Sequence, residues 1–250
     1  MTATAPERHL QAASPSWTSA ANGSLRRLSA TMAAGALLGL LVGGVGGRLA
    51  MALLAHLNPE LAGLLSDDGF TVGQVTLAGT LNLLAIGTFL GALGAVVYVV
   101  LRGLMIGPRW FQVLSIRLGP AVVVGEQLVH TDGVDFTFLD PASLGIAMFV
   151  AIPGLYAALL TLLAERWRAP ESFFARGPAL PALLPLVTIA PLVATLVVPV
   201  TGWLTMELAR RRWPRALAAG PAIAWAGRAA LAVVFVVALV RLVDEIGVLT

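Results

Sequence analysis

The stretch GALLGLLVGGVGGR, residues 35–48, decides the fold of this chain. Its glycines recur at a four-residue spacing, at Gly35, Gly39, Gly43 and Gly47. In an α-helix, residues four apart lie on one face, so these glycines form a nearly straight ridge without side chains. Such a ridge lets a second helix approach closely, which is how helices associate in lipid, where apolar burial between helices contributes little. The stretch therefore predicts a bundle of membrane helices.

The composition of the whole chain indicates the same class. Of its 250 residues, 58% are hydrophobic and 12% are charged, and the mean hydropathy is +0.88. A soluble domain carries about 25% charged residues, so this chain is too apolar to cover itself with a charged surface. It has no cysteine, and all 16 basic residues are arginine, which excludes disulfides, thiolate metal sites, cysteine nucleophiles and lysine Schiff bases. The arginines gather at the ends of apolar segments, as membrane topology requires, so we expect no nucleic-acid partner.

Apolar segments divide the chain into a tail and a bundle. Residues 1–25 are rich in Ala, Ser, Thr and Pro and predict a disordered cytoplasmic tail, and 26–250 predict a single transmembrane helical bundle. Four segments are long enough, at about 1.5 Å per residue, to cross a hydrocarbon core of about 30 Å. These segments are 29–56, 75–101, 142–164 and 222–243.

Two further segments leave the number of spans open. Residues 110–130 are long enough to cross but contain charged residues and a proline. Residues 179–206 are apolar but carry prolines at positions 181, 185, 191 and 199, which predicts a kinked, broken or re-entrant helix. Counting both segments gives an all-α bundle of about six transmembrane helices, and five is the alternative.

The arginines also predict the orientation of the bundle. Arg26 and Arg27 precede the first span and place the N-terminus in the cytoplasm of a multi-pass protein of the cell membrane. The loops 57–74 and 131–141 contain no arginine and three acids each, so we expect them outside. One conflict arises, because the arginines in 210–215 also fall outside if 179–206 crosses once. A re-entrant hairpin at 179–206 removes the conflict, and so does leaving 110–130 uncrossed.

The second span carries small residues that match the ridge of the first. Gly87 and Gly91 lie four residues apart, with Gly79 before them and Ala95 after them. Two ridges without bulky side chains can pack closely, so we expect the first two spans to pair through their glycines.

Arg48 is the strongest candidate for a functional polar residue. An ionisable group at membrane depth costs about 3 kcal/mol on insertion scales, so such residues are usually paired or functional. A snorkelling or paired arginine with a structural role is the simpler interpretation, and the alternative is an anion-binding residue or an internal ion pair. Glu126, which lies in 110–130, is a possible partner, and Arg228 on the last span is another candidate.

His56 and His130 fall at the predicted outer surface, on the same side as the acidic loops. Histidines with carboxylates can hold a divalent metal, and two facing histidines can hold a haem. The spacing matches no metal motif, however, and no HExxH, GxSxG or phosphotransfer motif occurs, so we expect no metal, no cofactor and no catalytic residue.

Four stretches resemble a family of uncharacterised integral membrane proteins common in actinobacteria. They are GGRLAM at 46–51, DDGFTVGQVTLAGT at 67–80, DFTFLDPASLGIAMF at 135–149 and GRAALAVVFVVALVRLVDEI at 227–246. The resemblance implies that 110–130 is a genuine span, although Arg117 and Glu126 depart from the family's pattern there. It implies no function.

Three functional hypotheses remain, in the order in which the residues favour them. The first is a non-enzymatic accessory, scaffold or regulatory membrane component, whose partners are the lipid bilayer and other membrane subunits. The second is a small transporter or channel with Arg48 and Glu126 in its pathway. The third is a metal or haem membrane protein that uses His56 and His130.

Overall fold

The computed structural model describes residues 17–66, 69, 71–102, 109–129, 134–187, 201–202, 204–205 and 221–249. Within this part of the chain the secondary structure is helical, and the only extended pairing is an isolated bridge between Leu65 and Thr71. The all-α prediction is therefore confirmed for the described residues.

The first long rod joins three helical segments without a break. It consists of α1 (Trp17–Leu38), the π-helix η1 (Gly39–Gly46) and α2 (Gly47–Leu57), and spans 41 residues. The helix begins at Trp17, whereas the sequence predicts a disordered tail through residue 25; residues 1–16 lie outside the described part. The early start has a packing cause, because α1 also contacts two short helices further along the chain and buries Ala20 and Ser24.

The remaining elements follow in chain order. They are η2 (Pro59–Leu61), α3 (Leu77–Arg102), α4 (Arg109–Leu128), α5 (Val134–Thr137), α6 (Ala142–Trp167), α7 (Phe173–Arg176), α8 (Ala179–Leu183) and α10 (Pro221–Leu249). The proline-rich segment predicted at 179–206 starts with the five-residue α8 and a turn through Val187, and residues 188–200 lie outside the described part.

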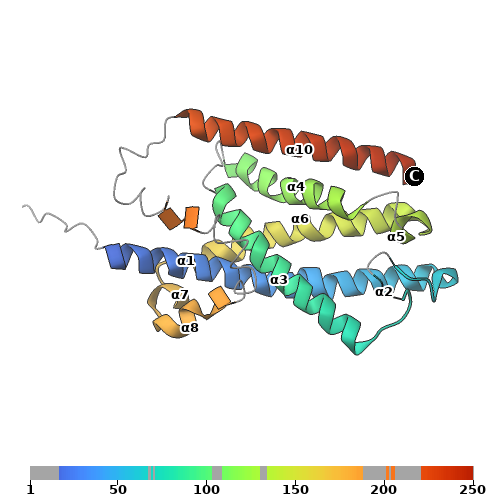
Figure 1. The fold of residues 1–250 in the computed structure, drawn as a ribbon, viewed down its shortest axis with the longest axis horizontal. Coiled ribbons are helices and arrows are strands. Elements are labelled where there is room, and N and C mark those ends of the chain that lie inside the picture. Colours follow the sequence, from blue (N-terminus) through green and yellow to red (C-terminus); the bar gives the residue numbers. More distant parts are fainter. Residues whose placement is uncertain are drawn as a thin grey trace, which may run out of the picture.

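The long helices form a bundle with one crossing member. In Figure 1, α6, α4 and α10 run alongside the α1–α2 rod, whereas α3 crosses the rod at an angle. Helix α3 packs on α1 and η1, α6 packs on α1 and α4, and α10 packs mainly on α4. This order of neighbours decides which polar residues can meet.

The last helix runs in the same direction as α4. Leu242, near the end of α10, shares an apolar cluster with Val129, just past the end of α4, and with Ile146, near the start of α6. Helix α10 therefore begins at the end of the bundle where α6 finishes, and the chain's C-terminus lies at the opposite end (Figure 1). This geometry bears on whether residues 179–206 cross the membrane, and so on which side the arginines in 210–215 lie.

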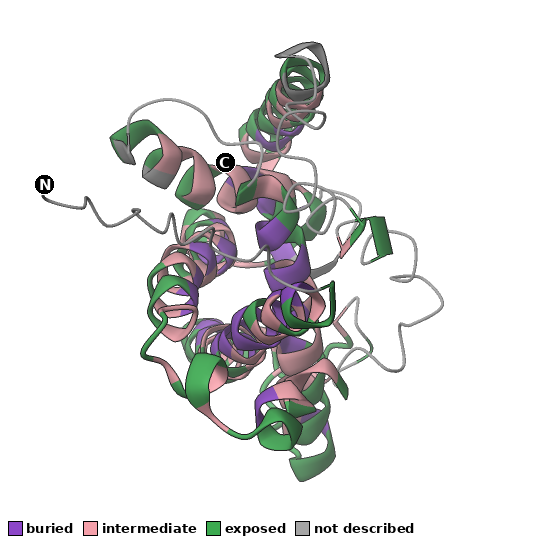
Figure 2. Cartoon of the chain, turned by 90° about the vertical axis from the view of Figure 1, so that its left-hand side faces the viewer, coloured by how far each residue is buried: buried purple, intermediate pink, exposed green. Residues whose placement is uncertain are grey.

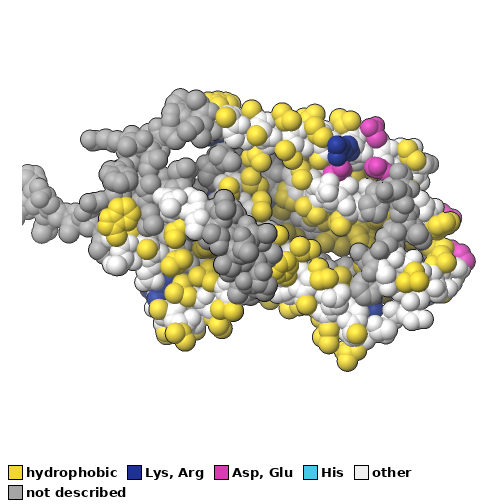
Figure 3. Space-filling model, in the orientation of Figure 1, with side chains coloured by type: hydrophobic (Ala, Val, Ile, Leu, Met, Phe, Trp, Pro, Cys, Tyr) yellow, Lys and Arg dark blue, Asp and Glu magenta, His cyan; other side chains and the backbone are white. Residues whose placement is uncertain are grey.

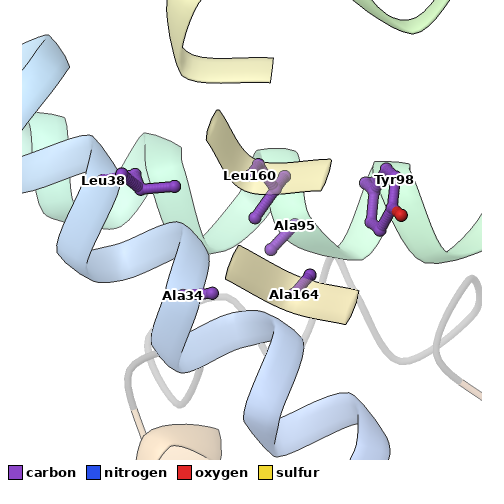
Figure 4. Close-up of a cluster of buried hydrophobic side chains, with 6 residues drawn as sticks. All are labelled: Ala34, Leu38, Ala95, Tyr98, Leu160 and Ala164. Atoms are coloured by element: carbon purple, nitrogen blue, oxygen red, sulfur yellow. The ribbon is translucent and has the colours of Figure 1, made fainter. Parts of the chain in front are cut away.

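Small side chains make up much of the core. Where α1, α3 and α6 meet, the buried cluster consists of Ala34, Leu38, Ala95, Tyr98, Leu160 and Ala164 (Figure 4). Buried residues lie on the inward sides of the helices, and the outward sides are exposed (Figure 2). The three alanines lie among three larger side chains, so the helices pack closely where they meet.

The outer surface is strongly apolar. Hydrophobic side chains cover most of the described face in Figure 3, and large ones are freely exposed, among them Leu49 at 66%, Leu81 at 56% and Val240 at 54%. An apolar surface this extensive is unfavourable in water and suits lipid. Within the described residues, three helices are long and apolar enough to cross a membrane, namely Trp17–Leu57, Leu77–Arg102 and Ala142–Trp167. Together these features support a membrane protein.

Candidate functional site

A close contact between helices involves backbone atoms of α1, η1 and α3. Gly35 and Gly39 lie against Gly91 and Gly87. A methyl group added to Gly39 would lie 2.7 Å from the Cα atom of Gly91, and one added to Gly87 would lie 2.7 Å from the amide nitrogen of Gly44. Separations under 3.0 Å essentially never occur for real Cβ atoms, so no larger residue fits at these positions without a shift.

The π-helix changes which glycines face α3. The four-residue spacing assumes a regular α-helix, but residues 39–46 form π-type turns, which hold more residues per turn. Gly44 takes the close position, with an added Cβ 3.1 Å from the Cα of Leu84, while the corresponding distance for Gly43 is 3.6 Å from the Cα of Gly87. Gly47, with an added Cβ 4.0 Å from a methyl group of Leu83, makes only ordinary contact.

Arg48 and Glu126 do not form the predicted ion pair. The Nη2 atom of Arg48 donates to the backbone oxygen of Gln74 at 3.3 Å, and its Nε atom is buried without a hydrogen-bond partner among the described residues. Glu126 instead lies 3.6 Å from Arg241, with only 12% of its side chain exposed. The physical reason is the order of helices, because α4 packs between α6 and α10 and directs Glu126 to α10.

The other predicted polar candidates do not form a site in the described residues. The guanidinium group of Arg228 lies over the ring of Trp225, 5.3 Å from its centre, on the same helix. His56 is exposed near the end of α2, and His130 lies outside the described residues. Among the described residues, no group of three or more His, Asp or Glu side chains is placed to hold a metal ion.

Two polar side chains that the sequence analysis did not single out join segments far apart in the chain. The Tyr156 hydroxyl of α6 donates to the backbone oxygen of Gly91 at 2.5 Å, directly beside the glycine contact. Asn58, which is 1% exposed, donates to the oxygen of Leu54 at 2.9 Å and accepts the amide hydrogen of Asp140 at 2.7 Å. Asn58 directly follows an apolar helix in the sequence, and this position could have indicated a side chain that binds the helix end.

Arginine side chains dominate the end of the bundle where α1 starts. Arg26 donates from Nη1 to the backbone oxygens of Phe174 at 3.0 Å and Gly177 at 2.9 Å, which holds α7 against α1. Ser29 adds a hydrogen bond of 2.6 Å to the oxygen of Ala182 in α8. These contacts fix the short segment that follows α6.

A second polar cluster lies at the same end, between α3 and α6. Arg102 binds Glu165 through two hydrogen bonds, 2.7 Å from Nε and 3.0 Å from Nη2, and the Tyr98 hydroxyl donates to the same carboxylate at 3.1 Å. In the sequence, Arg102 and Glu165 directly follow the predicted spans 75–101 and 142–164. Both spans end on the same side of the predicted bundle. Their opposite charges at that side could therefore have indicated an ion pair.

Arg168 follows directly after α6 and completes this cluster. Burial, and then the positive charge of Arg102, lower the pKa of Arg168, and its Nη1 atom is buried without a hydrogen-bond partner among the described residues. A pocket of about 250 Å³ lies here, lined by Arg27, Arg102, Glu165, Arg168, Ala169 and Pro170.

Fold and surface together define an all-helical protein with helices able to span a membrane. Comparisons with protein-family models, with curated proteins and with solved structures gave no match. Inference about function therefore depends on the geometry of the chain itself.

Proposed function

We propose that this chain is a multi-pass protein of the cell membrane that acts as a non-enzymatic accessory, scaffold or regulatory component. The observation that carries the proposal is that polar side chains on or near the helices bind neighbouring helices and loops. Tyr156, Asn58 and the Glu126–Arg241 pair each connect one helix or loop to another. Groups committed to such contacts hold helices in register and are not placed for chemistry.

We further propose five crossings. Three are made by the helices that are long and apolar enough, namely the α1–α2 rod, α3 and α6, and two by α4 and α10, which pack alongside them. The support is that α6 ends and α10 begins at the same end of the bundle (Figure 1). A single crossing by 179–206, which six spans require, would start α10 at the other end. A segment that does not cross, or that re-enters, keeps the arginines at 210–215 on the side of Arg26 and Arg27, as the positive-inside rule demands.

Affinity purification from native membranes tests the accessory role. We expect the tagged full chain, extracted in mild detergent, to leave the column with a membrane partner at a fixed ratio. The variant Gly39→Leu, expressed at the same level, serves as the control, because its disrupted bundle should lose that partner. A wild-type chain that migrates alone as a monodisperse particle would contradict the accessory role.

A specific observation favours a second candidate function, that of a small transporter. Arg48 has a buried Nε atom with no partner among the described residues, which leaves one donor for a passing anion. In reconstituted vesicles, wild-type protein should then move a small anion and Arg48→Ala should not. Glu126 has no part in this pathway, because it is paired with Arg241. Vesicles in which the wild-type chain moves no chloride or phosphate would end this alternative.

A further inference from the structure

The pocket between α1, α3 and the segment after α6 carries an excess of positive charge. Three guanidinium groups, from Arg27, Arg102 and Arg168, line it together with one carboxylate, Glu165. The carboxylate is held by both Arg102 and Tyr98, so it compensates one of the three charges. Arg26 is committed to backbone oxygens of α7 and does not line the pocket. Among the described residues that line the pocket, two guanidinium groups are therefore left without a counter-charge.

Arg168 contributes a buried positive charge to this arrangement. Its Nη1 donor is buried and has no partner among the described residues, although a buried unpaired donor costs about 1–3 kcal/mol, and more when charged. Burial and the nearby charge of Arg102 also lower its pKa, but an arginine remains protonated in proteins. The fold thus holds a protonated guanidinium group in a buried, unfavourable position. A bound anion would neutralise its charge and accept its hydrogen bond.

We propose that this pocket binds a phosphate group. The planar guanidinium fork matches the oxygens of a phosphate and can bind two at once. The volume of about 250 Å³ is below the about 300 Å³ at which pockets for drug-sized ligands begin, so it suits a small anionic group. The phosphate can belong to a lipid headgroup or to a free ion.

The position of the pocket favours contact with the membrane surface. Arg102 is the last residue of α3, and Arg168 follows the last residue of α6. The ends of spanning helices lie at headgroup level, where basic pockets between helices bind anionic lipids. The site rests on the proposed membrane insertion, but it adds a ligand that the accessory role does not require.

Thermal unfolding of the purified full chain in a neutral, lipid-free detergent tests the site. The probes are inorganic phosphate against chloride at equal ionic strength, and micelles with added phosphatidylglycerol against phosphatidylcholine. We expect the unfolding temperature to rise with phosphatidylglycerol, with phosphate, or with both. A response to phosphate alone assigns a free ion, and a response to phosphatidylglycerol alone assigns a headgroup. No rise with either probe would overturn the proposal.

Variants separate the pocket from general surface charge. Arg27→Gln, at an exposed position, and Arg168→Gln each remove a charged hydrogen bond to the ligand. Each should therefore raise about tenfold the concentration of phosphate or phosphatidylglycerol needed to increase the unfolding temperature. Arg166→Gln removes an exposed arginine that does not line the pocket and should respond as the wild type does. Equal losses in all three variants would overturn the proposal.

A second readout distinguishes a binding residue from a structural one. Without ligand, Arg168→Gln should unfold at the same temperature as the wild type or higher, because it removes an unpaired buried charge. A clear fall in that temperature would assign Arg168 to the fold and contradict the proposal. Failure of the site leaves the chain in the membrane fraction, whereas recovery of the chain without detergent would overturn the proposed membrane role itself.

Discussion

At the scale of single residues, the absence of a side chain is the decisive property. Glycine costs about 1 kcal/mol relative to alanine inside a helix, so glycines at a helix contact need compensation from packing. Gly39 and Gly91 receive it, because their backbones touch across the contact between η1 and α3. At open positions such as Gly247, where an added Cβ meets nothing within 4 Å, no such compensation exists.

This contrast gives the first prediction. Gly39→Ala should lower stability by about 2 kcal/mol, because the new methyl group overlaps the backbone of α3. Gly247→Ala, in α10, should leave stability unchanged or raise it by up to about 1 kcal/mol. Thermal unfolding in detergent measures both. Equal effects of the two substitutions would show that η1 and α3 do not meet at Gly39.

Asn58 gives a second prediction at this scale. Asn58→Ala should lower stability by about 1 kcal/mol, because it removes the buried Asn58 side chain and the hydrogen bond that this side chain accepts from the amide of Asp140. Asn22→Ala is the matched control, since Asn22 is exposed and bonds only to the nearby Arg26 in the described residues. If both variants unfold at the wild-type temperature, the hydrogen bond between Asn58, which follows α2, and Asp140, which precedes α6, does not stabilise the protein.

At the scale of elements, helix order determines which charges meet. The sequence predicts α3 and α6 well, with 75–101 and 142–164 expected and Leu77–Arg102 and Ala142–Trp167 found, because apolar length alone marks a span. It does not predict that Glu126 meets Arg241, since no local pattern orders helices around a bundle. The π-turns of η1 were also missed, because glycines carry no side chains that distinguish π-type from α-type turns.

The contact of α10 with α4 leads to a third prediction. Glu126→Arg should lower the unfolding temperature, because it places two positive charges where Glu126 and Arg241 now lie 3.6 Å apart. The double reversal Glu126→Arg with Arg241→Glu should recover part of the loss. The coupling should be no more than about 1 kcal/mol, since Arg241 is 67% exposed. A double variant as unstable as the sum of its parts would exclude the pair.

At the scale of the whole molecule, the bundle has one arginine-rich end and one end without that concentration of positive charge. Arg26, Arg102 and Arg168 share the first end, where α10 also begins, and α10 finishes at the other (Figure 1). The sequence predicts the side of the N-terminus but leaves that of the C-terminus open, because the course of 179–220 decides it.

This polarity yields a fourth prediction, about topology. A reporter fused to the C-terminus should lie outside the cell, so alkaline phosphatase should be active there and green fluorescent protein should be dark. The same reporters fused after Arg168 should give the opposite result and serve as the control. Fluorescence from the C-terminal fusion would require an odd number of crossings between α6 and α10.

The backbone contact between the first rod and α3 inside a membrane is the central feature of this fold. An added Cβ on Gly35 would lie 2.5 Å from that of Ala95 and closer still to the oxygen of Gly91, whereas a disulfide needs about 3.8 Å between its Cβ atoms. The rod and α3 must therefore move apart slightly, and the bond then holds them side by side. The chain has no cysteine of its own, so a pair can be introduced cleanly. In the matched control, the second cysteine is placed at Leu90, which is 55% exposed, instead of at Ala95.

The decisive measurement is therefore oxidation of Gly35→Cys/Ala95→Cys in native membranes, read as loss of thiol labelling. The account predicts a disulfide within the chain for this pair and free thiols for Gly35→Cys/Leu90→Cys. Thiols that stay free in both pairs, or disulfides that form equally in both, would contradict it.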